Sequence, residues 1–355
     1  MKKVFYLVFV IFLLYSKILS AQIPNGYYDS AINLADDDLK YALNQIIDNH
    51  IEFPYTSQSV DTWDILKDTD RDPDNSNNII LLYSGVSVDG SQEYNNGNGW
   101  TREHVWAKSR GDFGTSLGPG TDVHSLRPLD NTTNSIRNNR GFDNCTVCVD
   151  VYDQWSNLTG SKIDYIEWSF EPRDEVKGDV ARMIFYMDVR YEGYDSHPDL
   201  EVSETILDLS DNSPLHGVRS TLLEWHRNDP VDDWEENRND IIYYNYQNNR
   251  NPFIDYPELI EHLWGNQIGI EWNYSLKLPD NVLSNLSIYP SPTNDKLIVK
   301  GLSNEIKVSV FNILGGFLFS KTISSEIDVS SLKSGIYIVK IYGDHKEKIT
   351  RFVKN

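Results

Sequence analysis

Two stretches decide which fold this chain can adopt: WTREHVWAKS at residues 100–109 and TDVHSLRPLDNTTNSIRNNRGFDN at residues 121–144. In the first, Glu103 stands directly before His104, with cations on both sides. In the second, Asp130 is a residue that commonly begins helices, and a helix starting there carries Asn134 and Arg137 on one face. The sequence therefore predicts an extended stretch that bears Glu-His, followed by a helix that bears Asn and Arg.

The Glu-His pair has the chemistry that phosphodiester hydrolysis needs, namely a base for water and a cation for the charged transition state. Glu103 is a hard oxygen ligand suited to Mg²⁺, and His104, with an ordinary pKa of ~6.5, is a base at neutral pH. Asn134 can ligate Mg²⁺ without adding charge, and Arg102 and Lys108 can hold phosphate oxygens. Neighbouring strand residues point to opposite faces, so the pair can serve one site only where the strand ends or bends. By itself the pair is equally compatible with an ordinary surface or core histidine.

Overall charge argues against broad attraction to nucleic acid. The 355 residues carry a formal net charge of −21, which repels phosphate. Residues 100–140 nevertheless contain six cations and four anions. A local basic cleft on an acidic body is therefore compatible with the composition.

The N-terminus has the pattern of a signal peptide covering residues 1–21. A basic start precedes an apolar run at residues 4–15 that is too short to cross a bilayer, and Ser20 and Ala21 offer a cleavage site. No later stretch is apolar enough to span a membrane, so we expect an exported protein without a transmembrane segment. Export permits a disulfide between Cys145 and Cys148, which we favour over a redox pair or two thiols.

Helical periodicity recurs along the body of the chain. Helices are predicted at residues 36–50, 174–191, 219–230, 231–253 and 257–265. After about residue 278 the sequence changes to short runs of alternating apolar and polar residues separated by turn residues, a pattern typical of a small β-sandwich. Residues 285–355 carry ten cations and six anions, unlike the acidic body. The change in pattern and charge predicts two domains.

Several motifs together resemble the bacterial endonuclease I family of secreted nucleases. They are REHVWAKS, DVHSLRPLDNTTNSIRNN, KGDVARMIFYMDVRY and QNNRNPFIDYPELIEHLW. The resemblance covers residues 35–265 and implies an α+β fold: a mostly helical nuclease domain around a ββα-metal (His-Me finger) core, with the small all-β sandwich beyond it. One departure is Ala107, where the family often has proline.

The same resemblance assigns chemical roles. It implies that His104 is the general base and that Glu103 and Asn134 are metal ligands. Our hypothesis for the mechanism adds that the metal is one Mg²⁺ (Mn²⁺ and Ca²⁺ being alternatives) and that Arg137 or Arg127 stabilises the transition state. It also implies cleavage of DNA, and often of RNA, without sequence specificity, leaving 5′-phosphate ends. Further substrate contacts are predicted from Arg102, Lys108, His124 and Arg140. Each of these has a structural alternative, since arginines can pair with the many acids and His124 can serve only to orient a neighbour.

The tail resembles the C-terminal sorting domain of the type IX secretion system, on the motifs LSIYPSPTNDKLIV, VSVFNILGG and GIYIVKI. That resemblance implies passage through the outer membrane by this machinery, and a secreted or surface-attached monomer. The predicted division is a signal peptide at 1–21, a nuclease domain at 22–275, a linker at 276–284 and the sorting domain at 285–355. The rival interpretations are a Ca²⁺-binding adhesion protein and a hydrolase of other phosphoesters.

Overall fold

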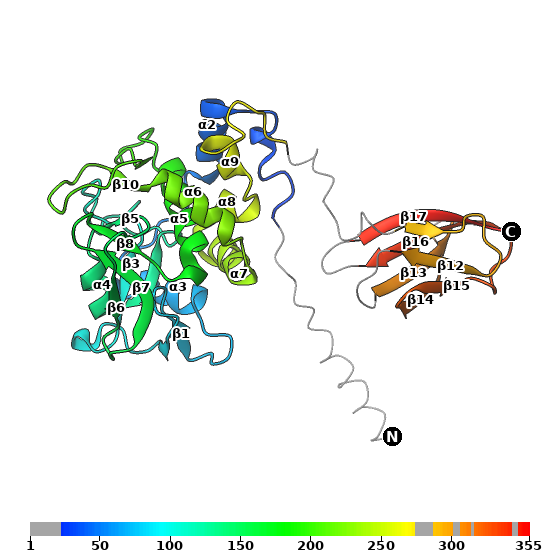
Figure 1. Cartoon of the computed structure of the whole chain (residues 1–355), viewed down its shortest axis with the longest axis horizontal. Coiled ribbons are helices and arrows are strands. Elements are labelled where there is room, and N and C mark those ends of the chain that lie inside the picture. The colour runs from blue at the N-terminus through cyan, green and yellow to red at the C-terminus, as the bar shows by residue number, and fades with distance from the viewer. Residues whose placement is uncertain (1–22, 274–286, 301–305, 314–315, 343–346) are drawn as a thin grey trace, which may run out of the picture. The chain divides into compact units, whose positions relative to one another are not determined.

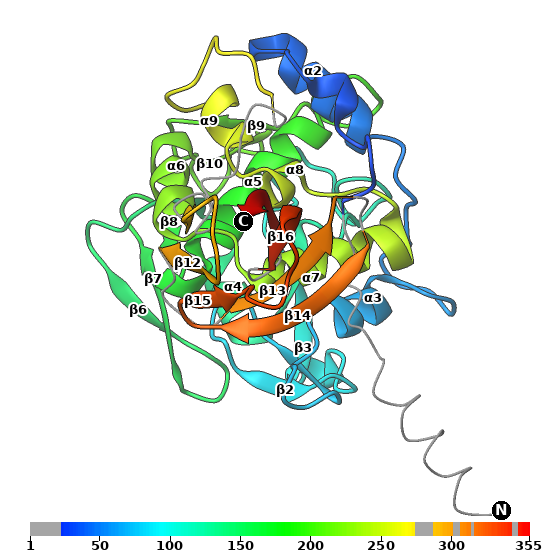
Figure 2. The same cartoon turned by 90° about the vertical axis from the view of Figure 1, so that its right-hand side faces the viewer.

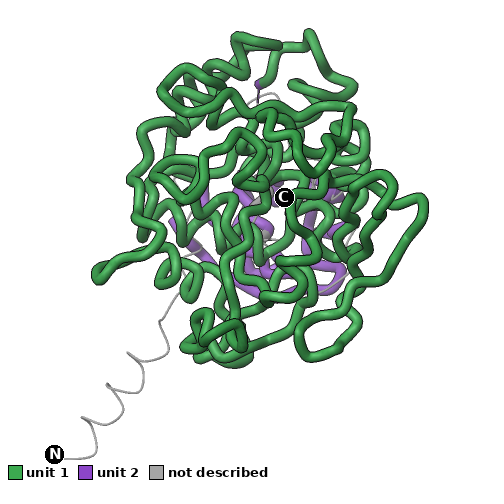
Figure 3. The backbone as a smooth tube through the Cα atoms, turned by 90° about the vertical axis from the view of Figure 1, so that its left-hand side faces the viewer, with its two compact units in different colours: residues 1–272 green, residues 273–355 purple. Residues whose placement is uncertain are grey.

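The computed structural model describes residues 23–273, 287–300, 306–313, 316–342 and 347–355. The chain divides into two compact units, Met1–Trp272 and Asn273–Asn355 (Figures 1 and 3). The predicted signal peptide and linker lie outside the described residues, and the exact domain limits stay a prediction. Within the described residues, no helix is both long and apolar enough to cross a membrane.

The first unit contains a strand pair followed at once by a helix. Strand β3 (Trp100–His104) pairs antiparallel with β4 (Leu126–Asp130), so that Glu103 lies opposite Arg127. Helix α4 (Asn131–Arg137) begins directly after β4 and contacts both strands. The Asp130 carboxylate accepts a hydrogen bond from the Thr133 amide at 2.9 Å, which confirms the predicted start of the helix.

Short strands surround this strand pair. Strands β1 (Asn78–Ile80) and β2 (Ser87–Asp89) form a hairpin. A four-stranded sheet has the order β5-β8-β7-β6, with bounds Gly141–Phe142, Ser169–Glu171, Leu158–Asp164 and Val149–Tyr152. Strands β9 (Glu201–Ser203) and β10 (Leu215–Val218) pair in parallel. A disulfide joins Cys145 to Cys148 just before β6, which confirms the predicted local bridge.

Most predicted helices are present. They are α2 (Asp36–Ile47), α5 (Lys177–Arg190), α6 (Arg219–Asn228) and α9 (Leu259–Leu263). The helix predicted at 231–253 is broken: α7 (Asp233–Ile241) continues as a π-helical turn (Ile242–Gln247), Asn248 then takes a left-handed conformation, and α8 (Pro252–Asp255) follows. Short 3₁₀ turns lie at Asp29–Ala31, Asn95–Gly97 and Asp174–Val176.

Helix α3 (Thr62–Thr69) was not predicted by periodicity. Asp61 begins it: its carboxylate accepts hydrogen bonds from the Trp63 and Asp64 amides, and the Asp64 carboxylate accepts one from the Asp61 amide. Its apolar face packs with β1, β3 and β4 in a core of Trp63, Leu66, Ile79, Leu81, Trp100 and Leu126. This core holds the start of β3 in place.

One end of the first unit is helical, whereas α3 and α4 lie among the strands toward the other end. In Figures 1 and 2, α2 and α9 lie at the top while the β1–β2 hairpin lies at the bottom, and α5 runs between them. Every α5 residue from Gly178 to Arg190 is buried, so this helix is the centre of the unit rather than an amphipathic surface helix. Helices and strands both recur throughout the described residues. An α+β fold is therefore confirmed, whereas a mostly helical one is not.

The second unit is formed from β-strands, as predicted. One sheet has the order β11-β12-β15, with bounds Ser287–Tyr289, Lys296–Lys300 and Glu326–Asp328. The other has the order β14-β13-β16-β17, with bounds Phe317–Ile323, Ile306–Asn312, Gly335–Tyr342 and Glu347–Lys354. Residues from both sheets, among them Leu297 and Val339, share one hydrophobic core. Two sheets packed on one core make a β-sandwich.

Candidate active site

Glu103 lies on the second-last position of β3, with 2% of its surface exposed. Its Oε1 accepts a hydrogen bond from the Tyr83 hydroxyl at 3.1 Å and lies 3.2 Å from Arg137 Nε. Burial raises the pKa of Glu103 to about 7, although Arg137, Tyr83 and Lys108 all act to lower it. A nearby cation stabilises the charged form of such a buried carboxyl.

His104 ends β3, which is how it can share a site with its neighbour. Its Nε2 lies 3.0 Å from the Gly120 carbonyl oxygen, so Nε2 carries the proton and Nδ1 keeps a lone pair in the neutral ring. The imidazole stacks on the Tyr55 ring, with centroids 5.5 Å apart and planes 19° apart. Burial, together with the nearby charges of Lys108, Arg102 and Arg137, lowers the pKa of His104 to about 3, although the hydrogen bond to Gly120 acts to raise it. The ring is therefore neutral at pH 7.

Asn134 lies one turn into α4 and faces β3. Its Nδ2 donates to the carbonyl oxygen of Arg102, the residue before Glu103, at 3.4 Å. Within the described residues this is the one hydrogen bond of the Asn134 side chain, so Oδ1 has no protein partner there. The helix thus brings a neutral oxygen donor close to the Glu-His segment.

The donor set fits a hard divalent cation. A carboxylate and an amide oxygen are ligands that Mg²⁺ accepts, and Mg²⁺ usually keeps several waters instead of filling its shell with protein. Among the described residues, two clusters of three His, Cys, Asp or Glu residues could also hold a metal, but neither includes Glu103. One contains the Cys145–Cys148 disulfide, and the other is Glu192, Asp199 and Glu201, where Lys40 already pairs with both glutamates.

Arg137 is fully buried and holds the site together. Its guanidinium donates to the backbone carbonyls of His104, Val105 and Asn138 at 2.5–3.3 Å, and Nη2 lies 2.8 Å from His216 Nε2. With Glu103 beside Nε, these partners surround the charged group. The structure places Arg137 against Glu103 and gives it no open face toward a substrate.

Lys108 is the predicted cation that stays open to solvent. It is exposed, and no ion pair or hydrogen bond engages it within the described residues. Its charge lowers the pKa of both Glu103 and His104. An exposed ammonium group of this kind is suited to a phosphate.

Two other predicted phosphate contacts are buried among aromatic rings. The Arg102 guanidinium stacks on Tyr55 and Trp63, 3.4 and 4.0 Å from the ring centroids, and donates to Thr62 Oγ1 at 2.9 Å. Arg140 lies 3.8 Å from the Trp168 centroid and donates to the Ile136 carbonyl. The structure gives both arginines internal partners.

Arg127 and His124 are also engaged inside the protein. Arg127 pairs with Asp70 at 2.5 Å and Asp179 at 3.4 Å. His124 is 1% exposed, and its Nε2 lies 3.2 Å from the Asn249 carbonyl oxygen. Neither side chain contacts Glu103 or His104 through a described hydrogen bond, so their predicted roles toward the substrate stay predictions without geometric support.

Comparison with known proteins identifies the family of the chain. A family model described as Endonuclease I matches residues 35–258 of the chain. The chain belongs to the Endonuclease I family. Two extracellular ribonucleases are similar to it: that of Bacillus subtilis (strain 168) is 51% identical over 240 residues, 67% of this chain and 78% of the relative. That of Bacillus amyloliquefaciens is 48% identical over 238 residues, with the same shares of the two chains.

The second unit of this Endonuclease I chain has its own match. Residues 287–355 match the secretion system C-terminal sorting domain. The predicted sorting domain is therefore confirmed, and with it a secreted or cell-surface location.

Three contributors to the Endonuclease I site were missed by sequence reasoning. Tyr83 donates to Glu103, Gly120 supplies the carbonyl that orients His104, and Tyr55 stacks on the imidazole. Tyr83 precedes Glu103 by 20 positions, and no pattern in the chain links the two. Such partners follow from packing and could not be read from spacing.

Proposed function

We propose that this protein is a secreted endonuclease that hydrolyses phosphodiester bonds of RNA and DNA. The observation that carries the proposal is a buried carboxylate beside a neutral imidazole whose Nε2–H is held by the Gly120 carbonyl. Membership of the Endonuclease I family supports nuclease chemistry, and the names of its relatives support RNA as one substrate. The sequence β3, β4, α4 then corresponds to a ββα-metal core.

His104 is the general base in this proposal. Its Nδ1 takes a proton from a water molecule whose oxygen attacks the phosphorus, while Nε2 stays bonded to Gly120. The bond between phosphorus and the 3′ oxygen breaks, and the departing oxygen takes a proton from solvent, which leaves a 3′-hydroxyl and a 5′-phosphate. A ring that is neutral at pH 7 is ready to accept this proton without first losing one.

Glu103 and Asn134 would hold one Mg²⁺, with Mn²⁺ and Ca²⁺ as alternatives. The cation would supply positive charge against the crowded phosphate oxygens and the departing oxygen. Tyr83 and Arg137 fix the Glu103 carboxylate in position. Lys108, which is free to move, contacts a non-bridging phosphate oxygen or the next phosphate along the strand.

The test is digestion of RNA and plasmid DNA by the purified full-length protein, with Mg²⁺ or with EDTA, beside His104→Ala. We expect cleavage that needs the metal and falls by about 10²- to 10⁴-fold in the variant. Circular dichroism of the variant shows whether it is folded. A folded, Mg²⁺-supplied wild-type protein that cuts neither polymer would contradict the proposal and favour the Ca²⁺-binding adhesion interpretation.

The chemical ends of the products test which phosphorus–oxygen bond is broken. Ends with 5′-phosphate accept label from polynucleotide kinase only after phosphatase treatment, whereas 5′-hydroxyl ends accept it directly. DNA lacks a 2′-hydroxyl, so cutting of DNA requires an external nucleophile such as the water activated by His104. Cleavage of RNA alone, with 5′-hydroxyl ends, would rule out the proposed water attack.

A further inference from the structure

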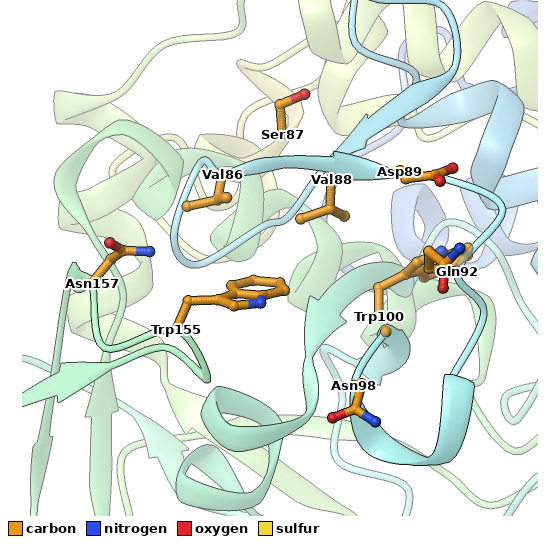
Figure 4. Close-up of a pocket in the computed structure, with 10 residues that line it drawn as sticks. Val86, Ser87, Val88, Asp89, Gln92, Asn98, Trp100, Trp155 and Asn157 are labelled. Atoms are coloured by element: carbon orange, nitrogen blue, oxygen red, sulfur yellow. The ribbon is translucent and has the colours of Figure 1, made fainter.

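A separate pocket of about 380 Å³ lies at the start of β3, and nothing in the proposed reaction uses it (Figure 4). Its lining comes from the β1–β2 hairpin, from residues 98–100 and from the turn between β6 and β7. The volume is in the range of pockets that bind small molecules. Figure 4 shows the Trp155 indole on one side and the side chains of Val86 and Val88 on the other.

The turn that presents Trp155 is held in place by several hydrogen bonds. Asp153, 3% exposed, accepts bonds from the amides of Trp155 and Asn157 at 2.8–2.9 Å. Gln154 donates to the Asn98 carbonyl at 2.9 Å, and its Oε1 accepts from the Asn131 amide at the start of α4 at 3.3 Å. The turn is therefore bonded to the segment just before β3 and to the start of α4, which are next to the elements that carry the candidate active site.

Trp155 itself contributes little to the core. Its side chain is 44% exposed, in contrast to Trp100, which is fully buried at the base of the pocket. An exposed indole facing two valine side chains leaves a slot open to a flat ring. Stacking of nucleic acid bases on aromatic side chains is the usual way in which proteins hold single strands.

Polar side chains lie at the edge of the slot. Asn157 Nδ2 donates to Asp153 at 2.9 Å, and Asn98 Nδ2 donates to the Asn95 carbonyl at 3.3 Å. Asp89 accepts hydrogen bonds from Ser91, which hold the pKa of its carboxyl below the usual range. The slot is thus apolar and aromatic on its two faces and polar at its edge.

We infer that this pocket is a nucleobase subsite that takes one unstacked base from the strand being cleaved. The inference rests on the proposed nuclease function. Trp100, at the base of the pocket, precedes His104 by four strand residues, which is about 13 Å along β3. A base in the slot therefore belongs to a nucleotide close to the scissile phosphate. Bases inside a duplex are already stacked, so the subsite favours single strands.

The test measures binding without cleavage. Fluorescence anisotropy of labelled oligocytidylate is followed with the full-length protein in EDTA, for wild type, Trp155→Ala, Trp155→Phe and Tyr41→Ala. We expect Trp155→Ala to weaken binding at least about fivefold, Trp155→Phe to retain most of it, and a duplex of mixed sequence to bind all four alike. Tyr41 is a matched control, because it is an exposed aromatic residue on α2, at the opposite end of the unit. Wild-type affinity in Trp155→Ala would overturn the inference.

Failure of the subsite and failure of the nuclease proposal give different results. If the wild type cleaves with Mg²⁺ and Trp155→Ala binds and cleaves single strands equally well, the subsite is wrong and the nuclease stands. If binding depends on Trp155 but no cleavage occurs with Mg²⁺, the base subsite is supported and the proposed hydrolysis is wrong.

Discussion

At the scale of single residues, the site differs from a typical phosphate site in that most of its cations are already neutralised. Arg127 pairs with two aspartates, Arg137 is surrounded by carbonyl groups, and Arg102 lies between aromatic rings. Arg190 and Arg250 likewise pair with carboxylates. Lys108 is the predicted cation that keeps an exposed side chain. The net acidic charge of the protein makes this exposed cation near the candidate site more important for binding a polyanion.

Replacing Lys108 by glutamine should therefore weaken the salt dependence of binding. If Lys108 contacts one phosphate of a single strand, the slope of log affinity against log salt should become shallower by about 0.7. The measurement is anisotropy of a labelled oligonucleotide in EDTA over a range of salt concentrations. Lys67→Gln is a matched control, because Lys67 is paired with Glu93 and Asp64. An unchanged slope for Lys108→Gln would show that this lysine does not contact phosphate.

Tyr83 offers a second prediction at this scale. Burial raises the pKa of Tyr83 well above its usual value, so its hydroxyl keeps the proton that it donates to Glu103. Tyr83→Phe should raise the Mg²⁺ concentration needed for half-maximal cleavage about tenfold or more, because Glu103 loses a partner that orients it. The control is Tyr186→Phe, a buried tyrosine that bonds to Asp122 instead. The same Mg²⁺ requirement in both variants would contradict the role given to Tyr83.

At the scale of elements, the loop after β3 decides where His104 points. Gly120 packs against its own loop: a Cβ there would lie 2.6 Å from the Ser116 carbonyl oxygen and 2.9 Å from that of Gly114. Backbone atoms cannot give way as a flexible side chain can. The loop is therefore built around a glycine whose carbonyl holds the imidazole.

Gly120→Ala should consequently displace that carbonyl and lower kcat by about 10- to 100-fold, with less effect on KM. Steady-state kinetics and a thermal unfolding curve separate misplacement of His104 from loss of the fold. Gly335→Ala in the second unit is the control, since its nearest contact would be an ordinary 3.6 Å. Normal kcat in Gly120→Ala would mean that the Gly120 hydrogen bond does not matter for catalysis.

At the scale of the whole molecule, the first unit depends on a buried polar network that should make it sensitive to acid. Burial lowers the pKa of His124 to about 4. For Asp122, burial raises the pKa, but His50, His124 and a hydrogen bond from Gln247 outweigh it and bring the value to about 2. Tyr186 and Tyr191 also donate to Asp122.

The sign of the effect follows from proton uptake. Between pH ~6.5 and about 4, His124 binds a proton in the unfolded chain and not in the folded one, so the free energy of unfolding falls as pH falls. Below pH ~4, Asp122 binds a proton in the unfolded chain but stays ionised in the folded one, which lowers the free energy of unfolding further. For His124 alone the loss by pH 4 is on the order of 3 kcal/mol.

Urea unfolding at pH 7 and pH 4.5, followed by tryptophan fluorescence, measures this loss. All nine tryptophans lie between residues 63 and 272, so the signal reports the first unit alone. His124→Gln should be less stable at pH 7 and should lose less stability on acidification than the wild type. Equal losses in both proteins would show that His124 does not titrate as its burial implies.

By itself, the sequence determined what depends on neighbours along the chain. The cap at Asp130, the periodicity of α2, α5 and α6 and the alternating strands of the tail are local patterns, and the structure contains them. The unpredicted α3 and the break after α7 show the limit, because packing on β1, β3 and β4 and the left-handed Asn248 decide them. Glu103, His104 and Asn134 could be predicted as candidate site residues because each lies in a motif that is continuous in the sequence.

Only the tertiary structure decided which charged groups are free to act. Arg127 follows its partner Asp70 by 57 positions and precedes its partner Asp179 by 52, and no pattern in the sequence links them. Burial then fixes the outcome, because a charge removed from water must be paired within the protein. Tyr83, Gly120 and the Trp155 slot depend on the tertiary structure too, because each acquires its role from residues that the fold brings beside it.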